Sequence, residues 1–400
     1  MIRKKIEKII RKSHFWRDVD FDKLSEIYIS NLLRSVSLTL FAVFVLFFLY
    51  ELGYSTPAIL ALFGYYFLFR TGFDFVAGFF VARFGPKHSL LVSAILQIVN
   101  ALMLLTLPTY KWNVALLALP WGASSSFYFI ALHVMMSKIK HTKKAGAEIG
   151  HLQVFEKIGN LVGPLIGGLV GTIFGPKYIF LVAVVLLLIS LVPLLRSAEP
   201  VKTRQKLRFR DLKIPAIKND LISYVGLTVE NTLCINTWPL YIALFVLSGA
   251  VYAKLGALTS FTVIVSILSA RLIGRLADTS FSRVLLRYGS IINALSYIFR
   301  SLTTNIWSVL GINIVNEVAT ASYRIPYMKG LYASSDDHPG LRIVYFVALE
   351  SISSVIKSFI WFLLAILSFG LGMKGALLVS FAIASLASLL IMKERFRVYN

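Results

Sequence analysis

Charged residues are scarce in this chain of 400 residues: only 15% are Asp, Glu, Lys or Arg, whereas soluble proteins average about 25%. Apolar residues make up 57%, and the mean hydropathy is +0.76. This composition excludes an ordinary soluble domain. The apolar stretches are long and continuous, and they lack the ten-residue alternation of an outer-membrane barrel. The sequence therefore predicts an all-α integral membrane protein, in which each helix needs about 20 residues to cross the bilayer.

Cysteine and the common signatures of catalysis are also nearly absent. The one cysteine, Cys234, lies inside an apolar stretch, so an intrachain disulfide is excluded and we interpret it as a small core residue. The sequence contains no GxxxxGK[ST] phosphate loop, no Cys/His spacing typical of a metal site and no Ser-His-Asp arrangement. We therefore predict that the protein is not an enzyme, does not use ATP, and holds neither metal nor cofactor.

The sequence lacks a cleavable signal peptide as well. Residues 1–23 are basic and amphipathic, without an apolar centre or a cleavage site, and they predict a helix at the membrane surface. The first apolar span is then expected to direct insertion. Twelve spans are predicted, at residues 28–50, 57–82, 88–108, 112–136, 148–173, 178–195, 219–247, 253–273, 284–303, 305–327, 342–368 and 374–392.

Acidic residues number 19 against 41 lysines and arginines, and the net charge of +22 raises the question of nucleic-acid binding. The distribution of charge argues against it. Twelve spans put both termini on one side of the membrane, and that side holds most of the basic residues. The opposite side holds only Lys111, Lys177, Lys254, Arg300 and Lys374. This positive-inside bias predicts cytoplasmic termini in a plasma or inner membrane, contact with anionic lipid at the cytoplasmic face, and no nucleic-acid partner.

The longest polar break between spans divides the chain into two halves. We expect a basic cytoplasmic segment at 1–27, a six-helix bundle at 28–195, a basic linker at 196–218, and a second six-helix bundle with a short tail at 219–400. The halves look like diverged copies, because Gly274 follows Gly78 at the same offset as Ser322 follows Ser126. The predicted fold is therefore two six-helix pseudo-repeats, and we expect a monomer.

Spans three, six, nine and twelve contain long stretches without charge, at 90–107, 179–195, 291–297 with its flanks, and 376–391, while other spans hold charges in their interior. An ion in hydrocarbon costs several kcal/mol, so these side chains are expected to face partners or a polar route. By their spacing, three pairs each share a helix face: Arg70 with Asp74, Glu317 with Arg324, and Glu350 with Lys357. Adjacent Glu156 and Lys157 need separate partners, and Glu230 has no basic neighbour close in sequence. A structural ion pair between helices is the alternative for each pair.

The loop after span two and the loop after span eight carry a shared short motif. The first copy reads GFFVARFGPK and the second reads GRLADTSF. Gly85 allows a tight turn, and Asp278 is expected to make a charged helix cap or an interhelix pair, with a solvated loop acid as the alternative. The residues that carry the motif are Gly78, Arg83, Gly85 and Lys87 in the first copy and Gly274 and Asp278 in the second.

Span five carries a more specific motif. The pattern GxxxxxxxxGxxxGPxxGG is matched by Gly150, Gly159, Gly163, Pro164, Gly167 and Gly168. The glycines at 159, 163 and 167 form one stripe, which lets two helix backbones approach closely. Pro164 bends the helix, and neighbouring helices must satisfy the freed carbonyl. Ordinary packing of small residues is the alternative interpretation.

With two halves of six spans, a basic central loop and these motifs, the chain resembles the major facilitator superfamily from span one to span twelve. The first motif is similar to the family pattern GxxxDRxGRR, except that Ala82 stands where the pattern has Asp. The span-five motif matches the signature of drug:proton antiporters. The resemblance implies two bundles that rock about a midplane site, and a loop that latches the cytoplasmic face. It also implies that spans 1, 4, 7 and 10 line a central cavity while spans 3, 6, 9 and 12 face lipid.

Buried acids are the first candidates for carrying protons or contacting substrate. We rank Glu230 and Glu317 first and Asp74 beside Arg70 next, because a desolvated carboxylic acid can exchange protons near neutral pH. His133 is expected at the surface. Family antiporters usually carry an arginine in span four, and this chain has none there. The aromatic side chains expected to line an amphipathic cavity, with core packing as the alternative, are Phe127, Tyr128, Trp238 and Tyr323.

Together these features predict a secondary active transporter, driven by protons, that exports amphipathic or drug-like small molecules. Its expected partners are that substrate and protons. Two alternatives stay open. One is a symporter or facilitator for a nutrient or lysolipid. The other is a transporter-like scaffold or receptor without transport.

Overall fold

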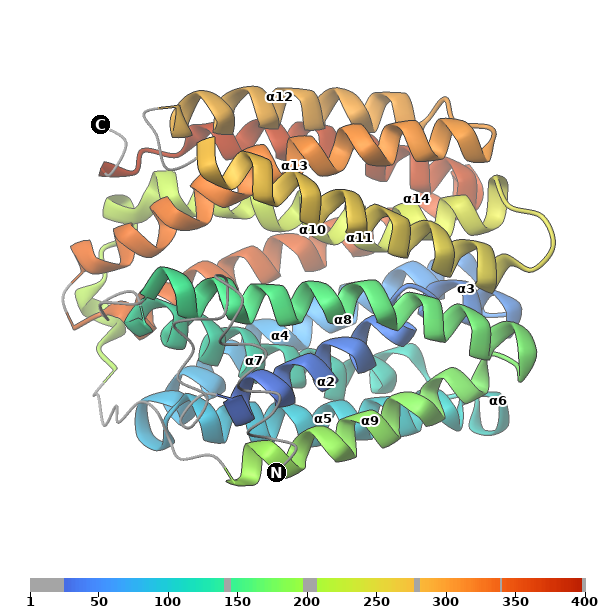
Figure 1. The fold of residues 1–400 in the computed structure, drawn as a ribbon, viewed down its shortest axis with the longest axis horizontal. Coiled ribbons are helices and arrows are strands. Elements are labelled where there is room, and N and C mark those ends of the chain that lie inside the picture. Colours follow the sequence, from blue (N-terminus) through green and yellow to red (C-terminus); the bar gives the residue numbers. More distant parts are fainter. Residues whose placement is uncertain (1–24, 140–144, 197–206, 277–280, 339, 398–400) are drawn as a thin grey trace, which may run out of the picture.

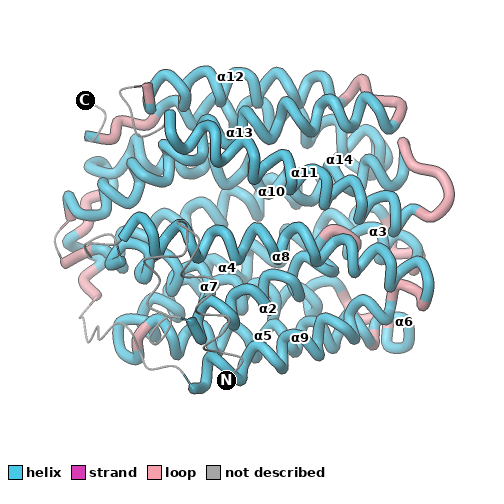
Figure 2. Tube along the Cα trace, viewed as in Figure 1, coloured by secondary structure: helices cyan, strands magenta, loops and turns pink. Residues whose placement is uncertain are grey.

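A computed structural model describes residues 25–139, 145–196, 207–276, 281–338 and 340–397. Within these ranges all regular secondary structure is helical, and the loops gather almost wholly at the two ends of the molecule (Figure 2). The predicted interfacial helix at 1–23 lies outside the described residues, as does much of the linker.

The first half of the chain forms the six predicted spans. Span one is broken into two helices, and a short extra helix follows span three. The helices are α2 (Ser25–Ala42), α3 (Val45–Glu51), α4 (Thr56–Phe84), α5 (Pro86–Leu105), α6 (Leu107–Tyr110), α7 (Val114–Ile139), α8 (Ala145–Ile173) and α9 (Lys177–Arg196).

The second half repeats the arrangement after two 3₁₀ turns, η1 (Phe209–Asp211) and η2 (Ile214–Ile217). Its last long helix contains spans eleven and twelve, which are separated at Gly372, where φ is +66°. Glycine suits this position because other residues are strained at positive φ. The helices are α10 (Lys218–Phe245), α11 (Val251–Leu276), α12 (Ser282–Arg300), α13 (Ile306–Ser334) and α14 (Arg342–Leu390), followed by η3 (Ser335–Asp337) within the loop after α13 and η4 (Ile391–Lys393) after α14.

By length and mean hydropathy, seven described segments qualify as membrane spans, and one of them, 342–393, is long enough to cross twice. The described part of α8, Ile158–Ile173, is too short to qualify, and helices α10, α12 and α13 do not qualify either. Each of them buries polar residues, such as Glu230 on α10, Asn293 on α12 and Asn316 on α13. The predicted all-α fold of twelve membrane-spanning helices in two bundles is confirmed.

Two helix pairs join the bundles: α4 packs against α14, and α8 packs against α11. In Figure 1, α8 and α11 face each other in the middle of the molecule, whereas α9 and α12 form its lower and upper edges. The predicted lipid-facing helices expose apolar side chains on their outer faces, including Ile95 on α5, Leu188 on α9, Phe299 on α12 and Leu386 on α14. This exposure agrees with the long uncharged stretches of spans three, six, nine and twelve.

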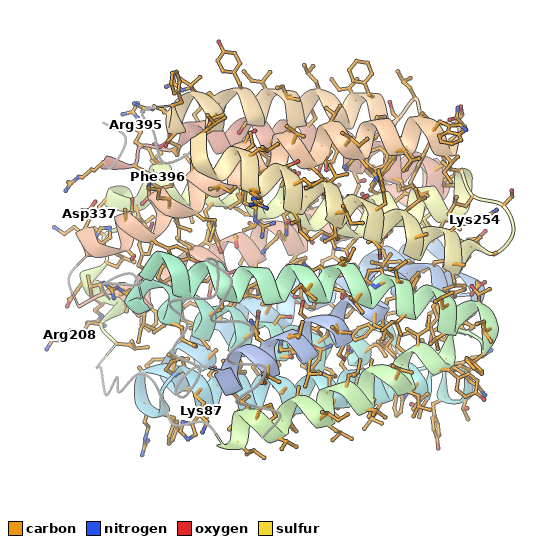
Figure 3. The ribbon with its side chains drawn as sticks, viewed as in Figure 1. Lys87, Arg208, Lys254, Asp337, Arg395 and Phe396 are labelled. Carbon is orange, nitrogen blue, oxygen red and sulfur yellow. The ribbon has the colours of Figure 1, made fainter. Side chains whose placement is uncertain are left out.

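Charged side chains lie at the two ends of the bundles. The end at which α2 begins and α14 ends, here called the terminus end, carries Lys87, Arg208 and Arg395, while Lys254 lies at the opposite end (Figure 3). The structure therefore puts these basic residues at the ends that the positive-inside pattern predicts.

The glycine stripe of α8 brings three helices into backbone contact. A Cβ atom on Gly159 would lie 2.6 Å from the Ser35 side chain, and one on Gly167 would lie 2.2 Å from the Leu40 carbonyl oxygen. On the neighbouring face, a Cβ on Gly168 would lie 2.6 Å from the carbonyl oxygen of Tyr252 on α11. The motif thus packs α8 against α2 within its bundle and against α11 across the bundles.

Substituting alanine for Gly163 tests this packing. The new Cβ would lie 2.2 Å from Thr39 Oγ1 and 2.7 Å from the Val36 carbonyl oxygen, so we expect the variant to lose about 2 kcal/mol of stability. The matched control is Gly72→Ala, because nothing lies within 4 Å of that Cβ position and the helix gains about 0.5–1 kcal/mol. Thermal unfolding of both variants in detergent measures the difference. Equal melting midpoints would contradict the packing role.

Candidate functional site

Five ionisable groups meet in the interface between the bundles, and three of them form ion pairs with one another. Arg70 Nε on α4 lies 3.7 Å from Asp74 Oδ1 one turn later, which confirms that the two share a face. Arg70 Nη2 lies 2.6 Å from Oε2 of Glu350 on α14, so this ion pair crosses from one bundle to the other. All three side chains are buried. Because α4 and α14 pack along their length, the pair is shielded from solvent and from lipid.

His133 and Tyr224 complete the shell around Glu350. His133 Nε2 lies 3.1 Å from Glu350 Oε1, and the Tyr224 hydroxyl donates to the same oxygen at 2.7 Å. The other ring nitrogen of His133 lies 3.3 Å from the Tyr332 hydroxyl, and the ring stacks on Phe346. The expectation of a surface histidine is wrong, because His133 is buried where α7 faces the second bundle.

Lys357 is the second cation of this interface. It is buried on α14, and its Nζ lies 4.5 Å from the centre of the Phe67 ring on α4. Although Lys357 and Glu350 share a face of α14, the contacts of Glu350 described above are with Arg70, His133 and Tyr224. Ser354, one turn from Glu350, lies 3.5 Å from Asp74 Oδ2.

The inter-bundle cluster is defined here as Arg70, Asp74, His133, Glu350 and Lys357. The cations Arg70 and Lys357 face the carboxylates of Asp74 and Glu350, so the charges of the cluster balance when His133 is neutral. One proton added to the cluster unbalances it, and in a low-dielectric setting a charge imbalance is costly. Uptake or loss of a proton by the cluster would therefore change how strongly the two bundles bind each other.

A second buried acid lies inside the second bundle. Glu230 is 2% exposed and accepts three hydrogen bonds. Asn293 Nδ2 donates to Oε1 at 2.9 Å, and the hydroxyls of Tyr297 and Tyr323 donate to Oε1 and Oε2 at 2.6 and 2.8 Å. Three neutral donors from α12 and α13 thus hold a carboxylate on α10. Sequence reasoning singled out Glu230 and missed Asn293 and Tyr297, because both lie in the uncharged stretch 291–297 of α12.

Arg300 is the last residue of α12, at the end of predicted span nine. It is 1% exposed, and its Nη1 lies 3.3 Å from Cys234 Sγ. Its guanidinium carbon lies 4.8 Å from the centre of the Trp238 ring and 4.5 Å from that of Tyr297. The side chain turns back into the bundle, and its aromatic contacts replace water at the end of the helix.

Glu317 and Arg324 on α13 differ in exposure. Glu317 is half-buried, whereas Arg324 is exposed and its Nη1 lies 3.4 Å from Asn231 Oδ1 on α10. Neither residue belongs to the inter-bundle cluster. Several predicted residues cannot be placed by their side chains: Gly150, Glu156 and Lys157 lie in the first turns of α8, where only the backbone is described, and Asp278 lies outside the described residues.

The loop motif after α4 lies against the second bundle. A Cβ on Gly78 would lie 2.6 Å from Val347 on α14, and Gly85 has φ +91° in the turn between α4 and α5, as predicted. Ala82 is buried in an apolar cluster with Ile343 and Val134, which explains why no acid stands there. Arg83 lies over the Phe84 ring, Lys87 is buried at the start of α5, and a Cβ on Gly274 would meet open space.

Three of the four predicted cavity aromatics lie in the packed interiors of their bundles. Phe127 packs on Phe80, and Trp238 stacks on Tyr241 and donates from Nε1 to Asn313 at 2.8 Å. Tyr323 donates a hydrogen bond to Glu230, as described above. The fourth, half-buried Tyr128, lies under the Arg34 guanidinium. These contacts support the packing alternative.

A second contact between the bundles lies toward the end opposite the termini. The Tyr252 hydroxyl of α11 donates to Glu51 at the end of α3, and its ring packs on Phe44 and Phe47. Ser260 Oγ donates to the Leu161 carbonyl of α8 at 2.7 Å. Sequence reasoning missed this contact, because Glu51 and Tyr252 both lie at span ends, where polar residues are common.

Comparison with known proteins follows this geometry. A sequence model described as Major Facilitator Superfamily matches residues 27–328. A search of curated proteins finds no match. Among solved structures, a POT family transporter in complex with a thioalcohol conjugated peptide is similar, with a TM-score of 0.71 and 14% identity over 92% of this chain and 95% of that chain. A POT family transporter in complex with 5-aminolevulinic acid has a TM-score of 0.68 and 12% identity over the same shares, 92% and 95%. At such identities the likeness concerns the fold.

Proposed function

Because this chain belongs to the major facilitator superfamily, a family of transporters and not of enzymes, we propose that it is a proton-coupled secondary transporter that works by alternating access. The observation that carries the proposal is the Arg70–Glu350 ion pair between the bundles, with His133 and Tyr224 on the same carboxylate. A proton taken up by Glu350 would act on the contact that rocking of the bundles has to change.

The proposed mechanism begins with a proton reaching Glu350. A neutral carboxylic acid binds the Arg70 guanidinium more weakly than a carboxylate does, so protonation weakens the link between α4 and α14. The bundles can then separate on that side while α8 and α11 stay in contact through Gly168 and Ser260. Loss of the proton restores the ion pair and resets the interface.

Glu230 is proposed as a second proton or substrate site. Its three donors hold the carboxylate in the second bundle, and Asn293 extends the network to Asn316 and Ser388. A polar chain of this kind inside a membrane-spanning bundle is expensive unless it serves binding or proton movement. Glu317 and Arg324, on the adjacent helix α13, are proposed to act with it.

The proposed direction is export, and the proposed substrates are amphipathic or drug-like molecules. The antiporter motif of α8 supports this choice, because its stripe from Gly159 to Gly168 packs α8 against both α2 and α11, the helices that must slide past it. Positive charge at the terminus end supports cytoplasmic termini in a plasma or inner membrane. We propose a monomer with anionic lipid at that face.

Uptake of a small nutrient with protons is the second candidate. The two similar structures hold a peptide conjugate and 5-aminolevulinic acid, so the assay has to include such solutes. Export and uptake differ in sign: a pH gradient that is acid outside drives loss of an exported substrate and gain of an imported one.

Proteoliposomes test the function. The purified full-length protein is incorporated into vesicles, and fluorescent lipophilic cations, dipeptides and 5-aminolevulinate are followed with and without an imposed pH gradient. We expect at least one amphipathic compound to move against its concentration, toward the acid side, only when the gradient is present. Absence of counterflow for every solute would favour the scaffold alternative. Accumulation of a peptide on the side opposite the acid would replace export by uptake.

A further inference from the structure

Arg34 is a buried cation that the proposed transport mechanism does not use. It lies on α2 and is 7% exposed. Its Nη1 lies 3.3 Å from Ser93 Oγ on α5, and its guanidinium carbon lies 3.9 Å from the centre of the Tyr128 ring on α7. Among the described residues, no carboxylate lies within ion-pair distance of it. A hydroxyl and a ring face are weak compensation for a full charge removed from water.

Two neighbouring donors lack partners among the described residues. Arg34 Nε and Asn31 Nδ2 are both buried, and no described group accepts a hydrogen bond from either, although Asn31 accepts from the Tyr128 hydroxyl through its oxygen at 3.3 Å. The residues are three apart on α2, so they lie on one face. Asn31 is 9% exposed. Buried donors are nearly always satisfied in folded proteins, so two neighbouring exceptions indicate a missing acceptor.

Both side chains line one pocket. Its wall consists of polar residues of α2 and the facing residues of α5 and α9, and its volume is about 20 Å³, which is room for one oxygen atom of a ligand. The lining residues are Ser30, Asn31, Arg34, Leu90, Ala94, Ser190 and Leu194. Arg34 is the tenth residue of α2, so the pocket reaches about 13 Å in from the terminus end of that helix.

The position of the pocket suits an acceptor that comes from the membrane surface. Helices α5 and α9, which line the pocket together with α2, also expose apolar side chains such as Ile95 and Val192, so the pocket is bordered by two of the predicted lipid-facing helices. The terminus end is also the end with most of the positive charge, which concentrates anions there. Arg34 supplies a forked cationic donor and Asn31 an amide donor, the combination that binds oxyanions of the phosphate class.

We propose that Arg34 and Asn31 form a binding site for a phosphate-class oxyanion, either the headgroup phosphate of an anionic lipid or free inorganic phosphate. The ligand stabilises the first bundle by satisfying the two donors. The site is separate from the inter-bundle cluster, because its lining residues come from α2, α5 and α9 and not from α4 or α14.

Thermal unfolding of the full-length protein in a maltoside detergent, which carries no phosphate, tests the site. The midpoint is measured with added phosphatidylglycerol, with added inorganic phosphate, and with sodium chloride at equal ionic strength. A rise with phosphatidylglycerol alone identifies a lipid headgroup as the ligand. A rise with inorganic phosphate identifies the free anion. A protein that responds to neither, or equally to chloride, overturns the proposal.

Three variants locate the response. Arg34→Gln is expected to weaken the apparent affinity about tenfold or more, because it removes the charged donor. Asn31→Asp provides a second test that keeps the arginine. The new carboxylate lies one turn from Arg34 and takes the place of the ligand. We expect this variant to stay stable and to lose the rise in midpoint that the ligand causes. Arg287→Gln, an exposed arginine on α12 near the same end, is the control and is expected to respond like the wild type. A full response in Arg34→Gln or Asn31→Asp would overturn the assignment.

Discussion

Replacing Glu350 by glutamine is expected to lower pH-driven transport about 100-fold, because the group that pairs with Arg70 across the bundle interface can then no longer gain or lose a proton. The same change is expected to cost about 3 kcal/mol of stability, since it leaves the buried Arg70 without its 2.6 Å counter-ion. Transport is measured in proteoliposomes under an imposed pH gradient, and stability by thermal unfolding. Solute counterflow, which needs no net proton movement, is expected to persist.

Two control variants separate coupling from stability. Arg70→Met/Glu350→Met removes both charges, so it is expected to be more stable than Glu350→Gln and still uncoupled. Glu394→Gln removes a buried carboxylate whose Oε1 lies 3.6 Å from Arg283 Nε within the second bundle. That variant is expected to lose stability and keep pH-driven transport. The account fails if Glu350→Gln and Glu394→Gln reduce coupling equally.

The second large effect concerns Glu230. Glutamine at this position keeps one carbonyl acceptor but presents an amide donor to a shell that already consists of donors from Asn293, Tyr297 and Tyr323. We expect pH-driven transport to fall about 100-fold, because the buried site no longer accepts a proton. The measurement is the same vesicle assay, with thermal unfolding to show that the variant is folded.

Tyr323→Phe is the matched control for Glu230. It removes one of the three donors and keeps the carboxylate, so a loss of about tenfold or less is expected. The double variant Glu230→Gln/Glu317→Gln gives the strictest result. If it transports under a pH gradient at the wild-type rate, neither acid carries the proton and the assignment is wrong.

Helix positions and the division into halves could be predicted because they depend on local properties: the length of apolar stretches, the scarcity of charge, and the side on which lysines and arginines fall. The pairing of Arg70 with Asp74 was predictable for the same reason, since a spacing of four residues fixes one helix face. The turn at Gly85 followed from glycine alone.

Contacts between distant residues could not be predicted. Arg70 and Glu350 are 280 residues apart, and nothing in either local sequence indicates the other. His133 was placed at the surface because a histidine near a helix end is usually solvated, yet the second bundle covers it. Arg300 was assigned only to the side opposite the termini, and its contacts with Trp238 and Tyr297 inside the bundle were not predicted. Only the packing of twelve helices decides which polar groups meet.

Simultaneous recording of substrate and internal pH in the same vesicles tests most directly whether the inter-bundle cluster couples protons to transport. For the wild type, we expect each movement of substrate to be accompanied by proton movement in the opposite direction. For Glu350→Gln, we expect substrate exchange without a pH change. Proton movement that still follows substrate in Glu350→Gln, at the wild-type ratio, would contradict the account.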